Sequence, residues 1–252
     1  MNGMRGLLVG AARSVAKSCG IDFQRVSQYT APMIRLAMLL DRLRTTVVID
    51  IGANEGQFAA DLRAAGYRGR IVSVEPLSAA HAALTRAAAN DSQWMIAERC
   101  AVGAAPGKAT LHVAGNSVSS SLREMTAAHL DAAAYSKYVG TEEVRVVTLA
   151  DLIAQYGGAS DAHVFIKLDV QGHERDVLDG AGDRLDTIGG IQLELSLVEL
   201  YAGQALMPAQ VDFLAAHGLA LWSLDRGFMD GKTGRLLQCD GTFVRESAIA
   251  NG

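Results

Sequence analysis

The sequence predicts an α/β fold, with a doubly wound, largely parallel sheet and an antiparallel strand at its end. Apolar, β-rich runs alternate with segments of helical period along most of the chain, which is typical of a parallel sheet with helices on both faces. Half of the 252 residues are hydrophobic, enough for a core on each face. A glycine-rich stretch without helical period joins the last two apolar runs, so these are expected to pair antiparallel.

Residues 1–45 are expected to form a helical N-terminal segment, and residues 46–252 the α/β domain. Pro32 marks the start of a helix whose apolar side chains share one face, namely Met33, Leu36, Ala37 and Leu40. We expect this helix to cover the sheet. The apolar stretch before it is interrupted by Arg13 and Lys17 and is too short for a signal peptide or a membrane span. A basic amphipathic segment that contacts a membrane surface is the alternative to a packed helix.

The predicted elements of the domain follow one another in a regular order. A long polar stretch from Ala114 to Glu143 interrupts the order, and insertions of this length are usually lids or binding loops. The expected strands are 47–51, 71–74, 95–100, 108–113, 144–148, 164–168, 190–195, 219–224 and 241–245, and the expected helices are 56–66, 77–89, 149–155, 172–185 and 208–217.

Charge and cysteine usage exclude several classes of protein. The net charge of −4 comes from interspersed acids and bases, so a nucleic acid is not expected as a partner. Cys19, Cys100 and Cys239 are too few and too scattered for a disulfide framework or a zinc motif. A reducing, cytoplasmic setting is the expectation.

The stretch VVIDIGANEGQF, residues 47–58, predicts a buried strand, a tight turn and the start of a helix. Gly52 and Gly56 allow the backbone to approach a ligand closely, and Asp50 and Asn54 add polar groups. In an open α/β sheet this turn lies at the carboxyl end of the strand, where ligands bind. The glycine spacing is G-x-x-x-G and not the G-x-G-x-x-G of dinucleotide sites.

The next predicted strand ends in Glu75, whose carboxylate can accept hydrogen bonds from two vicinal ribose hydroxyls. Asp50 and Glu55 would repel a pyrophosphate but attract a sulfonium and an ammonium group. These acids favour S-adenosylmethionine as the ligand. A turn whose glycines serve geometry alone is the alternative.

The motif VFIKLDVQGHERDVLDGA, residues 164–181, gathers Lys167, Asp169 and His173 at one strand end, and the following strand places Glu194 at the same depth. Transfer of a methyl group to a hydroxyl requires a proton acceptor, and an imidazole with a pKa near 6.5 suits that task. We therefore expect His173 to be the general base, with Asp169 and Glu194 orienting it or the acceptor. A structural residue at a helix start, hydrogen-bonded to a neighbouring acid, is the alternative for His173. Structural acids paired with Lys167, and metal ligands, are the alternatives for the two carboxylates.

These blocks, together with CAVG, SVSSSL, IQLELSLVELY and LLQCDGTFVRE, resemble the FkbM family of S-adenosylmethionine-dependent O-methyltransferases over about residues 47–246, particularly its bacterial, sugar-modifying members. The resemblance implies the class I methyltransferase fold, a seven-stranded doubly wound sheet whose last strand is antiparallel. It maps the adenine-side segment on Cys100 and Ala101, and the cofactor turn and ribose acid on the residues named above. Relatives often carry a glutamate where Gln171 stands here.

The prediction is a cytoplasmic enzyme that methylates a sugar hydroxyl, on a glycolipid or a glycosylated natural product. A nicotinamide-dependent dehydrogenase is a rival hypothesis, which the missing G-x-G-x-x-G pattern disfavours. A non-catalytic protein that binds S-adenosylmethionine is the other.

Overall fold

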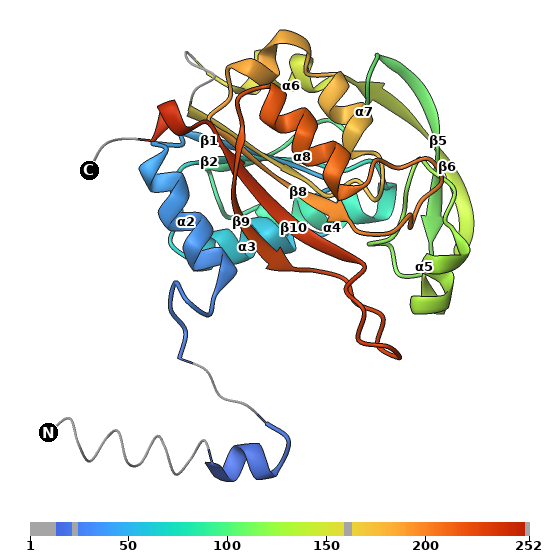
Figure 1. Ribbon diagram of the computed structural model, residues 1–252. Coiled ribbons are helices and arrows are strands. Elements are labelled where there is room, and N and C mark those ends of the chain that lie inside the picture. The colour runs from blue at the N-terminus through green and yellow to red at the C-terminus, as the bar shows by residue number, and fades with distance from the viewer. Residues whose placement is uncertain (1–13, 22–24, 159–162, 250–252) are drawn as a thin grey trace, which may run out of the picture.

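In the computed structural model, which describes residues 14–21, 25–158 and 163–249, a seven-stranded sheet forms the centre of the protein (Figure 1). The strand order is β3-β2-β1-β7-β8-β10-β9, and β10 runs antiparallel to both of its neighbours. This confirms the predicted doubly wound sheet and its antiparallel last strand. The strands are β1 (Val47–Ile51), β2 (Arg70–Val74), β3 (Trp94–Ile96), β7 (Val164–Leu168), β8 (Gly190–Ser196), β9 (Ala220–Arg226) and β10 (Gln238–Val244).

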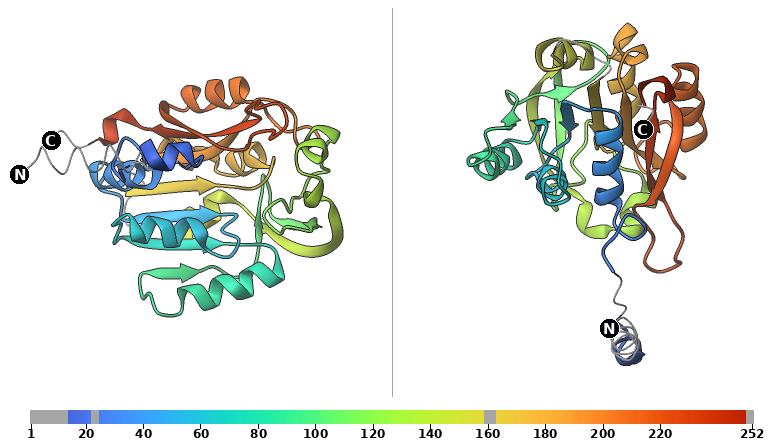
Figure 2. Two further views of the ribbon diagram at one scale, coloured as in Figure 1. Left: turned by 90° about the horizontal axis from the view of Figure 1, so that it is seen from below. Right: turned by 90° about the vertical axis from the view of Figure 1, so that its left-hand side faces the viewer.

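The sheet is buried on both faces because alternate residues of its central strands point in opposite directions. On β1, Val47, Ile49 and Ile51 belong to one apolar cluster, whereas Val48 belongs to another. The first cluster packs against α6 (Leu149–Tyr156), α7 (Glu174–Asp179) and α8 (Met207–Ala216), and the second against α2 (Pro32–Arg42), α3 (Gln57–Ala64) and α4 (Ser78–Ala88). Figure 2 shows the strand order from red β10 to green β3 in its left view.

The helix predicted from Pro32 packs on the sheet as expected. Leu36, Leu39 and Leu40 of α2 are buried in the cluster with Val48 and Phe165. Residues 14–18 are also helical, while residues 1–13 and 22–24 of the predicted N-terminal helical segment lie outside the described residues. Within the part of the chain that the structure describes, no helix has the length and apolar character needed to cross a membrane.

Two predicted strands do not join the main sheet. The residues around 108–113 and 144–148 form β5 (Gly107–Ala114) and β6 (Tyr138–Val147), which pair antiparallel with each other, and β4 (Ala101–Val102) completes a separate three-stranded sheet. Leu111 and Val146 close a small apolar cluster against the start of α4. The excursion from β5 to β6 carries α5 (Ala127–Ala132) and the short 3₁₀ helix η1 (Ala134–Ser136), which lie at one end of the molecule (Figure 1).

The helix predicted over 172–185 is divided. It consists of α7 and the 3₁₀ helix η3 (Gly182–Asp186), because Gly182 has a φ of +52° and so interrupts a right-handed helix. A further 3₁₀ helix, η4 (Glu246–Ala248), follows β10.

Candidate active site

A cavity of about 290 Å³ lies at the carboxyl ends of β1, β2 and β7. We call it the sheet-end cavity. Its position agrees with the rule that open α/β sheets bind ligands where the strands end. Residues predicted for cofactor binding line it, namely Asp50, Gly52, Asn54, Glu75, Cys100 and Ala101.

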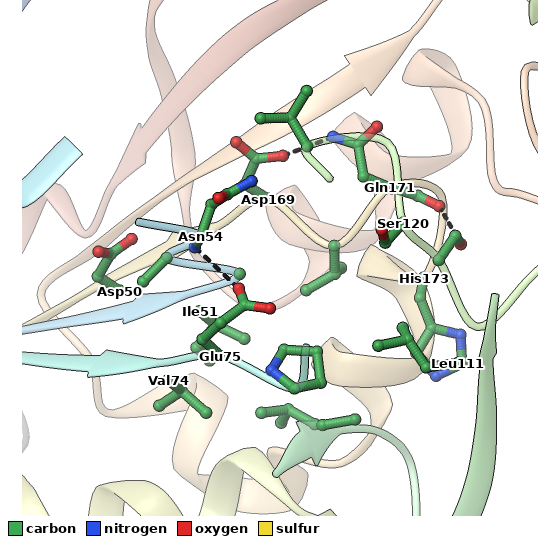
Figure 3. A pocket seen from close by; sticks show the side chains of 18 of the residues that line it. Asp50, Ile51, Asn54, Val74, Glu75, Leu111, Ser120, Asp169, Gln171 and His173 are labelled. Carbon is green, nitrogen blue, oxygen red and sulfur yellow. Dashed lines mark hydrogen bonds between the residues drawn. The ribbon is translucent and has the colours of Figure 1, made fainter. Parts of the chain in front are cut away.

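Glu75 is the central acid of the sheet-end cavity (Figure 3). Its Oε2 accepts a hydrogen bond of 2.8 Å from the backbone N–H of Asn54, and its Oε1 accepts one of 2.7 Å from the backbone N–H of Leu77. Burial raises its pKa to about 7, although both hydrogen bonds favour the charged form. The carboxylate is thus held rigidly and keeps lone pairs for a ligand hydroxyl.

Asp50 is fully buried at the end of β1. Its Oδ2 accepts a hydrogen bond of 3.1 Å from the hydroxyl of Ser73, which itself accepts one of 2.9 Å from the indole N–H of Trp94. Burial raises the pKa of Asp50 to about 6, and attraction to Lys167 opposes this rise.

Two oxygen atoms of residues that line this cavity have no hydrogen-bond partner among the described residues, Oδ1 of Asp50 and Oδ1 of Asn54. A buried acceptor without a donor is costly, so such atoms mark places where a ligand or water donates. Each of them could accept a hydrogen bond from an ammonium group of a ligand. Val74, Val102 and Leu111 also line the cavity, and such apolar side chains suit a flat ring.

The two predicted cofactor glycines differ in their surroundings. Gly52 lines the cavity with a φ of +79°, and a β-carbon there would lie 1.8 Å from the carbonyl oxygen of Asp169. Gly56 is buried, and a β-carbon there would lie 2.7 Å from the ring of Trp94. Gly56 is not among the residues that line the cavity. Gly56 therefore permits the close packing of the start of α3 on β3, and its contact with the cofactor stays a prediction.

The predicted catalytic carboxylates form one network at the ends of β7 and β8. The amide nitrogen of Gln171 donates to Asp169 at 2.6 Å and to Glu194 at 2.8 Å, and Lys167 lies 3.1 Å from Asp169. The hydroxyl of Tyr201 donates to the amide oxygen of Gln171 at 2.7 Å. An amide at position 171 is a donor that bridges two acids, which a glutamate carboxylate could not do.

This network separates the protonation states of the two acids. Lys167 and the hydrogen bonds from Gln171 and Glu194 hold the pKa of Asp169 below its usual range, even though burial opposes this. Burial and the charges of Asp169 and Glu174 raise the pKa of Glu194 well above its usual value. Asp169 is therefore the more acidic member of the pair, and Glu194 holds its proton more tightly.

His173 lies at the other side of the sheet-end cavity. Figure 3 shows its ring beside Leu111 and turned away from Asp169, and a β-carbon at Gly103 would lie 3.3 Å from its Nε2. Its Nδ1 lies 3.0 Å from the carboxylate of Asp176. Burial lowers the pKa of His173, so the ring is uncharged near pH 7.

A second cavity, of about 250 Å³, lies between the network and the excursion that carries α5. We call it the α5 cavity. It shares three lining residues with the sheet-end cavity, Val118, Asp169 and Gln171, and Glu194 lines it as well. It adds His129 and Phe228, which the sequence analysis did not single out. The position of His129 inside the long polar insertion was the one available signal.

No set of three or more histidine, cysteine, aspartate or glutamate side chains is placed to hold a metal ion within residues 14–21, 25–158 and 163–249.

Comparison with known proteins gives a family match. The model of the Methyltransferase FkbM domain matches residues 50–222. No curated protein matches the chain.

Two solved structures are examples of its structural neighbours. The O-methyltransferase from Bacillus cereus in complex with SAH is 11% identical, with 92% of this chain and 87% of that chain covered and a TM-score of 0.45. The 1,6-didemethyltoxoflavin-N1-methyltransferase from Burkholderia thailandensis, with bound 1,6-didemethyltoxoflavin and S-adenosylhomocysteine, is 13% identical, with 97% and 90% covered and a TM-score of 0.44. These scores are too low to carry an inference about this chain.

Proposed function

The chain belongs to the FkbM methyltransferase family, and from this premise we propose that it transfers a methyl group to a hydroxyl of a sugar, on a glycolipid or a glycosylated natural product. S-adenosyl-L-methionine is the cofactor, and it supplies an electrophilic methyl group on a sulfonium. Family membership removes the reason for the rival dehydrogenase hypothesis.

The residues of the sheet-end cavity fit this cofactor. Glu75 offers carboxylate oxygens to the ribose, and the unpaired oxygens of Asp50 and Asn54 suit an ammonium group. Cys100 and Ala101 line the same cavity as apolar side chains such as Leu111, and this apolar lining suits an adenine. The acidic lining also favours a cationic ligand through charge.

The observation that carries the proposed transfer is the common wall of the two cavities. Asp169 and Gln171 line both, so a donor in the sheet-end cavity and an acceptor in the α5 cavity would meet there. Asp169 is an anion beside this meeting point and can stabilise positive charge or orient a hydroxyl by accepting its hydrogen bond.

The test is methyl transfer from labelled S-adenosyl-L-methionine to a panel of neutral glycosides, glycolipids, phenols and amines, with the product identified by mass spectrometry and NMR. We expect methyl ethers of sugars. Transfer to phenols or amines but not to glycosides would refute the sugar as acceptor. Cofactor binding in calorimetry without transfer to any member of the panel would support a non-catalytic binding protein instead.

A further inference from the structure

We propose that the α5 cavity is the acceptor site and that His129 accepts the proton of the acceptor hydroxyl during methyl transfer. This inference rests on the proposed function, because it assigns the acceptor side of the same reaction. It differs from the expectation from sequence, which placed the proton acceptor at His173.

The wall shared by the two cavities fixes the location of the reaction. The methyl carbon and the acceptor oxygen must come within about 3–3.5 Å of each other before transfer. Only at a shared wall can ligands in two neighbouring cavities approach so closely, and Val118, Asp169 and Gln171 form that wall. His129 lines the α5 cavity, whereas His173 lines the sheet-end cavity alone.

His129 is buried and has an unpaired ring nitrogen. The residue is 4% exposed, and its Nδ1 has no hydrogen-bond partner among the described residues. The ring lies edge-on to Tyr201 at 5.1 Å between ring centroids and beside Phe228 at 5.5 Å. Burial lowers its pKa, so the imidazole is neutral near pH 7 and can take up a proton.

The lining of the α5 cavity indicates the class of acceptor. Among the described residues, neither lysine nor arginine lines the α5 cavity, and Asp169 supplies negative charge to it. This lining disfavours phosphates and carboxylates as acceptors. Neutral hydrogen-bonding side chains, including those of Gln171 and Gln238, suit several hydroxyl groups, and Phe228 offers an apolar face.

The size of the cavity agrees with a small acceptor group. Its volume of about 250 Å³ is just below the range of about 300–1,000 Å³ that is common for sites of drug-sized ligands. The volume is close to the 290 Å³ of the sheet-end cavity, and it is sufficient for a neutral sugar ring.

The acceptor oxygen forms a bond to the methyl carbon, while the bond between that carbon and the sulfonium sulfur breaks and its electron pair stays on sulfur. The hydroxyl proton passes to the unprotonated ring nitrogen of His129, and the resulting imidazolium later releases it to water. The carboxylate of Asp169, on the same cavity, favours this transient positive charge.

Several titratable groups face the same space and bear on the pH dependence of the reaction. Asp169, Glu194 and Tyr135 line the cavity with His129, and Tyr201 packs against its ring. The pKa of Asp169 is lowered by Lys167 although burial opposes this, the pKa of Glu194 is raised by burial, and the pKa of Tyr201 is raised by burial. Because His173 also has a lowered pKa and Asp50 has a pKa of about 6, a rise of the rate at low pH is assigned to His129 only if it disappears in the His129 variants.

The experiment compares His129→Gln and His129→Ala with wild type, with His217→Gln as the matched control. His217 lies at the end of α8 and pairs with Asp186 at 2.7 Å, outside both cavities. We expect turnover to fall about 10²- to 10⁴-fold in both His129 variants, with loss of the low-pH ionisation. Cofactor affinity, measured by calorimetry, is expected to stay within about threefold, which shows that the variants are folded.

A second measurement needs no variant. Histidine ¹⁵N NMR of the wild type loaded with S-adenosylhomocysteine is expected to show shifts of the His129 ring signals when a neutral methyl glycoside is added. The inference would be overturned if a glycoside that the enzyme methylates left these signals unchanged. It would also be overturned by a His129 variant with turnover within about threefold of wild type and the same pH profile. In either case the proposed function would stand.

The reverse outcomes are also distinct. If phenols and not glycosides are methylated, and the His129 variants lose that activity, the sugar as substrate class is refuted and the role of His129 is retained. If no hydroxyl compound is methylated or shifts the His129 signals, both proposals fail.

Discussion

We expect Glu75 to control cofactor affinity, and its contribution can be measured by changing the pH and by one substitution. Its carboxylate is buried, accepts two backbone hydrogen bonds and has a pKa of about 7 without ligand. Ribose hydroxyls donate hydrogen bonds, so they favour the charged form. The cofactor should therefore bind more tightly as the pH rises through 7, because protonated Glu75 must first lose its proton.

The magnitude follows from this pKa. With a value of about 7 in the free protein and an ordinary value in the complex, the dissociation constant should be about tenfold higher at pH 6 than at pH 8. Glu75→Gln removes the charge, and lost charge-assisted hydrogen bonds cost about 1.5–3 kcal/mol, or about 10- to 150-fold in affinity. This comparison belongs at pH 8, where most of the wild-type carboxylate is ionised.

Isothermal calorimetry over pH 6–8 measures both effects, and thermal unfolding reports the stability of the variant. Glu98→Gln is the matched control, because it makes the same change of charge at an exposed side chain that pairs with Arg145. Asp50, with a pKa of about 6, adds its own dependence at lower pH, which should persist in Glu75→Gln. Affinity of a folded Glu75→Gln variant equal to wild type at pH 8, or a flat wild-type profile, would refute the reasoning.

Three further predictions follow from the geometry. His173→Ala should weaken cofactor binding by about 0.5–1.5 kcal/mol and leave turnover at saturating cofactor nearly unchanged; a loss of about 10²-fold or more in turnover with intact affinity would restore His173 as the base. Glu75 and Glu174, both with a pKa of about 7 in the folded protein, favour the protonated folded form, so their contribution to stability is lost as pH rises. The unfolding free energy of the free protein should fall by about 1 kcal/mol per group between pH 6 and 8 in urea titrations, and a smaller fall is expected for Glu174→Gln. Amide hydrogen exchange in residues 115–137 should be fast in the free protein and slow with cofactor and acceptor bound; uniform protection without ligands would show that this segment is part of the core.

The sequence by itself determined the main sheet and the cofactor side of the site. Residues 47–51 are apolar apart from Asp50, and such a run specifies a strand buried on both faces whatever surrounds it. Because parallel strands end at one edge, Asp50, Glu75 and Asp169 had to meet there. Local pattern and one rule of topology were sufficient for this part.

Only the tertiary structure decided the small sheet and the acceptor side. Residues 108–113 and 144–148 have ordinary strand patterns, and the choice of partner strand depends on contacts between distant segments, which no local pattern contains. In the same way, His129 of α5 and Phe228 of the connection between β9 and β10 are about 100 residues apart in the sequence and meet only in the folded protein. The spacing of Gly56 predicts a ligand contact, and only the tertiary structure shows that this glycine also packs against Trp94, from a strand that no local rule places beside it.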